Sequence, residues 1–193
     1  MALAMSAGLL LSACDGGEGP TEPPTTGTVT SESTTPTEVT TEPSDIPTPP
    51  EVEAPTPAPE AAVDDHIGAI WAARYFMDLY TYMRQTGDTT QFEAMSAPEC
   101  EFCASSIENV VEIHEEGGWV EGGELVFDID EATANYPTAD EPNYVVQFTV
   151  TEQPSTIHAG DGTSDARPGA SGDVQVGLQY VDERYVVFGV NFG

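Results

Sequence analysis

The stretch Tyr144-Val-Val-Gln-Phe-Thr-Val-Thr151 decides the fold class of this chain. Apolar side chains alternate with polar ones, which is the period of a β-strand with one buried face. The same alternation recurs over residues 125–130, 174–180 and 186–192. Asp182-Glu183 separates the last two segments, so we expect a hairpin there. Residues 153–171 are polar and rich in glycine, and they predict a loop.

Helical periodicity precedes these strands. Residues 64–85 place a broad apolar face opposite a polar face that holds Arg74, Asp78, Thr81 and Gln85. A short helix over 89–95 and a third helix over 102–116 follow, and Gly117-Gly118 ends the third. Helices followed by one-sided strands predict an α+β domain over 61–193, with the helices packed on one face of a curved antiparallel sheet.

The N-terminal end predicts export. Residues 1–13 are apolar or small, and Leu11-Ser-Ala-Cys14 closes them. A signal peptide normally begins with positive residues, which are missing here, so we expect the true start to lie upstream. The pattern resembles the lipobox of bacterial prolipoproteins, which implies that Cys14 carries a diacylglycerol. The alternatives are an ordinary signal peptide with a chance cysteine and a buried apolar helix.

Residues 14–60 predict a disordered tether. The tract from Asp15 to Glu60 holds eleven Pro, twelve Thr and ten acidic residues, a composition that cannot bury a core. In polyproline II geometry it would reach roughly 140 Å at most. This length suits a spacer that holds the domain away from a bilayer.

The charge of the chain limits its partners. The formal net charge is −30, and four arginines are the only Lys or Arg residues. Such a surface repels phosphate, which argues against nucleic acid as a partner. It also repels anionic lipid, so the predicted membrane attachment depends on the covalent lipid. We therefore expect an extracytoplasmic protein on the outer face of the cell membrane.

The pair Cys100-Glu-Phe-Cys103 remains once Cys14 is assigned to the lipid. In an exported protein an even remainder predicts a disulfide. A thiol–disulfide exchange site is the alternative, but Glu99 and Glu101 oppose a thiolate and no strand precedes the pair. Two thiolates are also half of a structural zinc set, and no second half follows. Residues 161–165 lack the glycine spacing and final Glu of a calcium loop, so the sequence predicts no metal and no cofactor.

Three local motifs together resemble an uncharacterised family of actinobacterial lipoproteins: Thr-Gly-Asp at 86–88, the Cys pair at 100–103 and Gly-Gly-Trp-Val-Glu-Gly-Gly at 117–123. The order of helices and strands resembles the nuclear transport factor 2-like, or cystatin-like, cone. That resemblance implies helices in the concave side of a strongly bent sheet. It implies no activity.

Five side chains are candidates for a pocket inside such a cone: Trp71, Tyr75, His114, Trp119 and Phe127. We expect a non-catalytic binding module whose partner is a small apolar ligand or an envelope protein. The alternative is an enzyme with His114 as acid or base near Asp128. A lone His at a helix end is more often a dipole partner or a satisfied core residue. His66 and His158 lie in polar stretches and are expected on the surface.

Overall fold

The computed structural model describes residues 48–193. The predicted signal peptide, Cys14 and most of the predicted tether lie outside these residues. The helices are η1 (Pro59–Ala62), α1 (His66–Thr86), α2 (Thr90–Met95) and α3 (Glu101–Glu115). The strands are β1 (Trp119–Gly122), β2 (Leu125–Phe127), β3 (Thr133–Ala134), β4 (Tyr144–Glu152), β5 (Ser155–His158), β6 (Ser164–Arg167), β7 (Ala170–Val181) and β8 (Arg184–Phe192). The predicted order, helices before strands, is confirmed.

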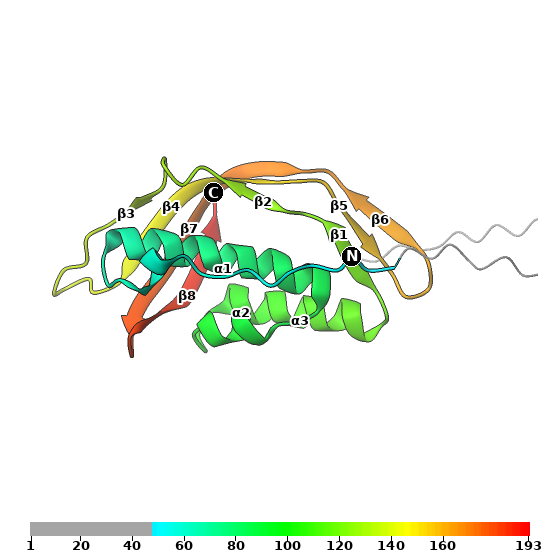
Figure 1. The fold of residues 1–193 in the computed structure, drawn as a ribbon, viewed down its shortest axis with the longest axis horizontal. Coiled ribbons are helices and arrows are strands. Elements are labelled where there is room, and N and C mark those ends of the chain that lie inside the picture. The colour runs from blue at the N-terminus through cyan, green and yellow to red at the C-terminus, as the bar shows by residue number, and fades with distance from the viewer. Residues whose placement is uncertain (1–47) are drawn as a thin grey trace, which may run out of the picture. The chain divides into compact units, whose positions relative to one another are not determined.

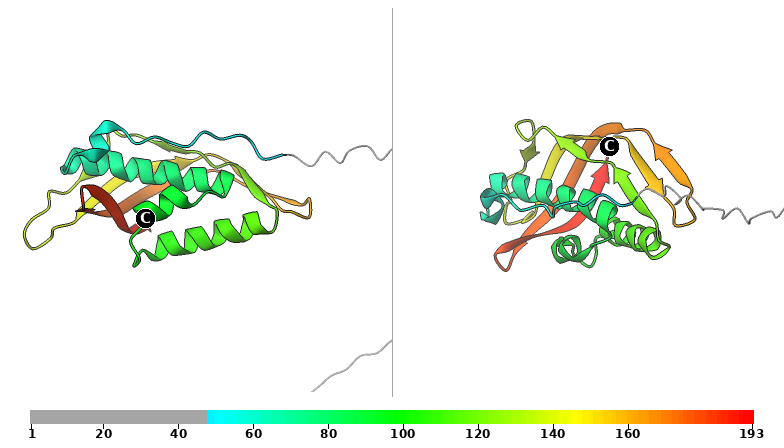
Figure 2. Two further views of the ribbon diagram at one scale, coloured as in Figure 1. Left: turned by 60° about the horizontal axis from the view of Figure 1, so that its bottom comes forward. Right: turned by 45° about the vertical axis from the view of Figure 1, so that its right-hand side comes forward.

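The strands form two antiparallel sheets that continue one another. The larger has the order β2-β4-β7-β8, with β3 paired to β4, and the smaller has the order β1-β5-β6. The chain passes directly from β1 to β2, from β4 to β5 and from β6 to β7. Each of these three connections joins a strand of one sheet to a strand of the other. The result is a single bent surface with α1, α2 and α3 on its concave side (Figure 1, Figure 2). The predicted α+β class with helices on a curved antiparallel sheet is confirmed.

Glycine and proline sit at every break between the two sheets. Gly122 and Gly123 have φ of +73° and +76°, which side chains rarely tolerate. Pro154 follows β4 and has no N–H to donate to a neighbouring strand. Gly169 precedes β7, and a Cβ there would lie 2.6 Å from the carbonyl oxygen of Glu152. Each of the three connections, β1–β2, β4–β5 and β6–β7, therefore bends at a residue where the hydrogen bonding between neighbouring strands cannot continue.

The prediction of a loop over 153–171 is wrong, because β5 and β6 pair within it as a hairpin. All four residues of β6 are exposed, so they carry no alternation of apolar and polar side chains. The turn between the two strands is held by Asp161, whose carboxylate accepts hydrogen bonds from Thr163.

Helix α1 is enclosed on most of its surface. The predicted apolar residues Phe76, Leu79 and Met83 are buried in the core. The predicted polar face is not wholly solvated, because Gln85 is only 5% exposed and donates to the carbonyl oxygen of Gly122 at 2.9 Å. Gln85 is buried because it lies against the bend between β1 and β2. The helical periodicity of the sequence contains no information about this tertiary contact.

The predicted disulfide joins Cys100 and Cys103 in the link between α2 and α3. Both cysteines are buried, and Cys100 is the N-cap of α3, where its sulfur accepts the backbone N–H of Cys103. The bridge therefore fixes the start of α3.

Candidate functional site

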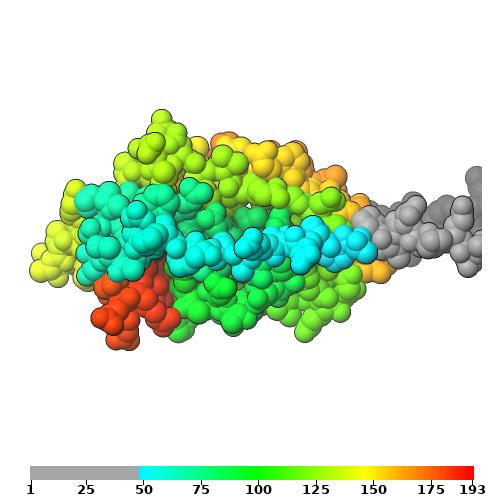
Figure 3. All heavy atoms as spheres, viewed as in Figure 1, coloured from blue at the N-terminus to red at the C-terminus, as the bar shows by residue number. Residues whose placement is uncertain are grey.

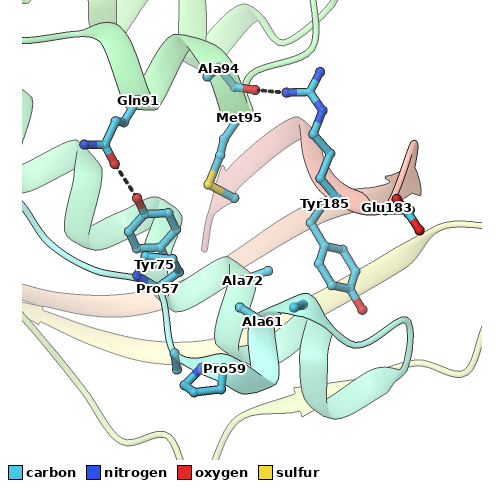
Figure 4. Close-up of a pocket in the computed structure, with 13 residues that line it drawn as sticks. Pro57, Pro59, Ala61, Ala72, Tyr75, Gln91, Ala94, Met95, Glu183 and Tyr185 are labelled. Atoms are coloured by element: carbon cyan, nitrogen blue, oxygen red, sulfur yellow. Dashed lines mark hydrogen bonds between the residues drawn. The ribbon is translucent and has the colours of Figure 1, made fainter.

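A hollow lies where residues 57–62 meet the helices and the β7–β8 hairpin. Its volume is about 470 Å³, within the range of small-molecule sites. Its walls come from residues 57–62, from α1, from α2 and from residues 183–185. Figure 4 shows Pro57, Pro59, Ala61, Ala72 and Met95 around it. Small and apolar side chains thus form most of this surface, which we call the apolar hollow.

Two polar side chains at its rim, Tyr75 and Arg184, are hydrogen-bonded within the protein, and the exposed carboxylate of Glu183 is a third polar group there. The hydroxyl of Tyr75 donates to the side chain of Gln91 (Figure 4). Arg184 donates to the carbonyl oxygen of Ala94 at 2.7 Å, near the C-terminal end of α2. A cation at that end also complements the helix dipole. A ligand in the apolar hollow would therefore be held mainly by apolar contact.

Three tyrosines from the sheet hold the N-terminal wall of the apolar hollow in place. Tyr144 of β4 donates to the carboxylate of Asp64 at 2.8 Å. Tyr180 of β7 donates to the carbonyl oxygen of Ala62 at 3.1 Å. Tyr185 of β8 lies 2.8 Å from the carbonyl oxygens of Val63 and Asp65. We call this set of contacts the tyrosine clasp.

Burial and charge raise the hydroxyl pKa values in the tyrosine clasp. The pKa of Tyr144 is raised to about 12, chiefly by desolvation and also by its hydrogen bond to the Asp64 carboxylate. Desolvation is also the main cause of the raised pKa of Tyr185. Both hydroxyls are therefore protonated, and able to donate, over the whole physiological range.

A second hollow, of about 320 Å³, lies inside the bend of the sheet, between α1, α3 and the smaller sheet. Tyr80, Val110 and Val120 line it together with Arg84. The Arg84 guanidinium donates to Glu152 at 2.7 Å, so the positive charge there is already paired.

The structure brings together only some of the five predicted pocket residues. Trp71 and Tyr75 line a small hollow of about 230 Å³ on α1, and Tyr75 also borders the apolar hollow. Phe127 lies close by, since the Arg74 guanidinium is 5.6 Å from the Phe127 ring and 5.9 Å from the Trp71 ring. These three residues thus share one region of the molecule.

His114 and Trp119 lie elsewhere. His114 contacts the last turn of α1, which at 1.5 Å per residue is about 20 Å from Trp71. Its Nε2 lies 3.0 Å from the Arg84 carbonyl oxygen, which can only accept, so Nε2 donates. Asp128 is exposed and accepts from the backbone N–H of Asp130. No carboxylate hydrogen-bonds to His114 within residues 48–193.

Trp119 is buried and stacks on His158, with 4.2 Å between ring centroids. His158, which was expected on the surface, is half-buried there, with its side chain 13% exposed. His158 pairs with Glu121 at 3.0 Å, a contact that the β1–β5 register creates. His66 lies against Tyr136, with ring centroids 4.6 Å apart.

Apart from Tyr75, the residues of the apolar hollow were not singled out in the sequence. Ala61, Ala72 and Met95 belong to three separate elements and are ordinary core residues by their local pattern. The one sequence feature beside them is the Pro-x-Pro-x-Pro run of residues 55–59 immediately before a helix.

Neither a membrane span nor a metal cluster occurs in the described part of the chain. No helix in residues 48–193 has both the length and the hydropathy to cross a bilayer. The same residues contain no group of His, Cys, Asp and Glu side chains suited to a metal ion.

Several solved structures are similar to this chain at low sequence identity. Aln2 from a Streptomyces species is 12% identical, with 65% of this chain and 89% of that chain covered and a TM-score of 0.41. A cystatin-like protein of unknown function from Nostoc punctiforme is 8% identical, with 63% and 86% covered and a TM-score of 0.36. An NTF2-like protein from Anabaena variabilis is 14% identical, with 66% and 90% covered and a TM-score of 0.32. Because these TM-scores are below 0.5, we base no functional inference on them.

The family assignment comes from the sequence. No curated protein matches the chain. A family described as a family of unknown function, DUF6318, matches residues 43–190, which is most of the chain and includes the helices and all but the end of the last strand. The chain therefore belongs to the DUF6318 family.

Proposed function

We propose that this chain is a lipid-anchored protein of the cell envelope whose folded domain is a non-catalytic binding module. The anchor is Cys14, and the membrane is reached through its covalent lipid. Support comes from the sequence Leu11-Ser-Ala-Cys14 and the Pro- and Thr-rich tract after it. The buried bridge between Cys100 and Cys103 fits an oxidising compartment.

The apolar hollow carries the binding part of this proposal. A hollow of about 470 Å³ can hold a small molecule, and its apolar walls favour an apolar ligand over a charged one. Tyr75 and Arg184 at its rim are hydrogen-bonded to Gln91 and Ala94, which leaves the Glu183 carboxylate as the rim group that could contact a polar part of a ligand. Of the two predicted partner classes, a small apolar ligand is the one this surface favours.

The two catalytic alternatives have less support. His114 uses its Nε2 proton to hold a backbone carbonyl, which is a structural use of the ring. Thiol–disulfide exchange needs an attacking thiolate to reach a sulfur atom, whereas Cys100 and Cys103 are each 1% exposed.

Titration with Nile red, a neutral apolar dye, tests the binding proposal. Ala61→Trp would fill the apolar hollow from η1, and Ala54→Trp is the matched control, because Ala54 is exposed and lies outside the lining. We expect dye fluorescence to rise with wild type and with Ala54→Trp, and the affinity for the dye to fall at least about tenfold with Ala61→Trp.

Met95→Ala provides an independent variant, because it enlarges the apolar hollow without filling it. We expect Met95→Ala to retain dye binding. Equal affinity of wild type and a folded Ala61→Trp variant would contradict the proposed ligand site. Loss of binding in both Ala→Trp variants would do the same.

A further inference from the structure

The second hollow, inside the bend of the sheet, holds half of the arginine residues of this chain. Arg84 of α1 and Arg167 of β6 both line it, whereas Arg74 and Arg184 do not. Acidic residues outnumber basic ones by 34 to 4 in the sequence. Two arginines at one hollow are therefore a local exception to the charge of the chain.

Strand pairing places Arg167 on the side of the smaller sheet that faces the hollow. Ile157 of β5 pairs with Val120 of β1 and with Asp165 of β6. Arg167 follows Asp165 by two residues, so both side chains point to the same face of the strand. Val120, Ile157 and Arg167 together form the wall of the hollow that the smaller sheet provides.

Arg84 is fixed in the hollow but keeps free donors. Its side chain is 16% exposed, and its guanidinium lies 5.3 Å from the ring of Tyr80. The hydrogen bond to Glu152 uses one of the five N–H donors of the guanidinium, and no other group in residues 48–193 accepts from it. A guanidinium held by one carboxylate in this way can still donate to a second one.

Helix α3 adds a buried hydroxyl and an apolar surface. Ser106 is only 8% exposed and lines the hollow, and its hydroxyl makes no hydrogen bond to any of residues 48–193. A ligand oxygen in the hollow would give this hydroxyl a partner. Val110 and Ile113 lie on the same face of α3, one and two turns further along, and are apolar.

The charges at the hollow favour an ion with a single negative charge. Glu112, which is exposed, is the acidic residue among the described residues of the lining, so it opposes the two arginines in part. The net charge of −30 on the whole chain repels an anion more strongly as the charge of the anion increases.

We propose that the second hollow is a binding site for a small organic acid that has one carboxylate and an apolar body. The carboxylate lies between Arg84 and Arg167, because a guanidinium matches a carboxylate in geometry, and Ser106 donates to it. The apolar body packs on the valine and isoleucine side chains of the lining. A volume of about 320 Å³ suits a ligand of this size.

This inference does not depend on the apolar hollow. The wall of the apolar hollow that residues 57–62 form belongs to the segment that crosses the surface in Figure 3. None of those residues lines the second hollow.

Octanoate is the probe, titrated into the full chain by isothermal titration calorimetry. Arg167→Gln removes a charge at the hollow, and Arg74→Gln is the matched control. Each of these arginines forms an ion pair near the surface, Arg74 with Asp78 and Arg167 with Asp165, but Arg74 lies outside the lining. We expect Arg167→Gln to weaken octanoate binding at least about fivefold, and Arg74→Gln to change it less than about twofold.

Two further variants test the other polar groups. Ser106→Ala should weaken octanoate binding about threefold, whereas Ser105→Ala, at the neighbouring exposed position, should leave it unchanged. Glu112→Gln should strengthen octanoate binding about twofold, because it removes a negative charge from the lining.

Four results would overturn the proposal. They are no binding of octanoate by wild type, equal affinity of wild type and Arg167→Gln, and inorganic phosphate that binds as tightly as octanoate. The fourth is loss of octanoate binding in Ala61→Trp with unchanged binding in Arg167→Gln, which would place the acid in the apolar hollow. If Arg167→Gln does not fold, as judged by circular dichroism, Ser106→Ala with its Ser105→Ala control decides in the same way.

Discussion

The imidazole of His114 closes the C-terminal end of α1. Its Nε2 donates to the Arg84 carbonyl at 3.0 Å, one of the last-turn carbonyls that have no partner within the helix. Beside it, Gly87 has φ +78°, and a Cβ at Gly87 would lie 2.9 Å from Cγ of His114. A glycine and a histidine from different segments of the chain thus form one C-cap.

Replacing His114 should therefore change stability. We expect His114→Ala to lower the free energy of unfolding by about 1–2 kcal/mol, because a part-buried carbonyl loses its donor. Glu115→Ala, one position along on the exposed side of α3, should change it by less than about 0.5 kcal/mol. Urea unfolding measures both. Equal stability of the two variants would mean that His114 does not cap α1.

The tyrosine clasp gives stability a dependence on alkaline pH. Tyr144 has a pKa of about 12 in the folded protein and about 10 when unfolded. Below pH 10 both states keep the proton, and above it the unfolded state loses its proton first. The contribution of Tyr144 is therefore complete below pH 10 and is lost as the pH rises toward 12.

Tyr144→Phe tests this directly. Between about pH 8 and pH 11, urea unfolding should show a smaller loss of stability for Tyr144→Phe than for wild type, although Tyr185, whose pKa is also raised, keeps part of the dependence. An identical pH dependence in the two proteins would show that the Tyr144 hydroxyl is not involved.

At the scale of elements, the β7–β8 turn places two residues in a backbone conformation that their side chains disfavour, and substitution can relieve this strain. Asp182 and Glu183 have φ of +50° and +62°, and such backbone favours Asn and Gly over other residues. We expect Asp182→Asn with Glu183→Gly to raise the free energy of unfolding by about 1 kcal/mol. Asp182→Val with wild-type Glu183 should lower it, because a β-branched residue tolerates positive φ poorly. Thermal unfolding checks both directions, and a lower Tm for the Asn-Gly variant would contradict this account of the turn.

The disulfide acts on the link between α2 and α3. It joins cysteines with a sequence separation of only 3, so the chain-entropy estimate of its contribution is about 2 kcal/mol. We expect Cys100→Ser with Cys103→Ser to lower the Tm by roughly 4–8 °C, as measured by calorimetry. An unchanged Tm would mean that the bridge does not stabilise the start of α3.

At the scale of the whole molecule, local sequence patterns predicted most of the fold. Alternation located β4, β7 and β8, because one face of each packs on the core. The β5–β6 hairpin was missed because β6 is exposed on both faces, so neither face produces a pattern. The bend also depends on pairing between distant strands, as at Gly169 and Glu152, which no local window contains.

The candidate site was less predictable than the fold. Trp71 and Tyr75 were predicted as pocket residues because large aromatic side chains often line ligand sites. Most of the apolar hollow is built from alanines and prolines, and these residue types do not indicate a binding site. Its position depends on the tyrosine clasp, which joins residues 80 to 122 positions apart in sequence. Such contacts arise only from tertiary structure.

The central claim, a binding domain held at the outer face of the membrane by lipid, is tested most directly by the intact mass of the mature protein. The protein would be taken from the membrane fraction of the cells that make it, with its N-terminus identified by fragmentation. We predict a chain that begins at Cys14 and carries the mass of a diacylglycerol on its sulfur. A chain that retains residues 1–13 with an unmodified Cys14 would contradict the claim.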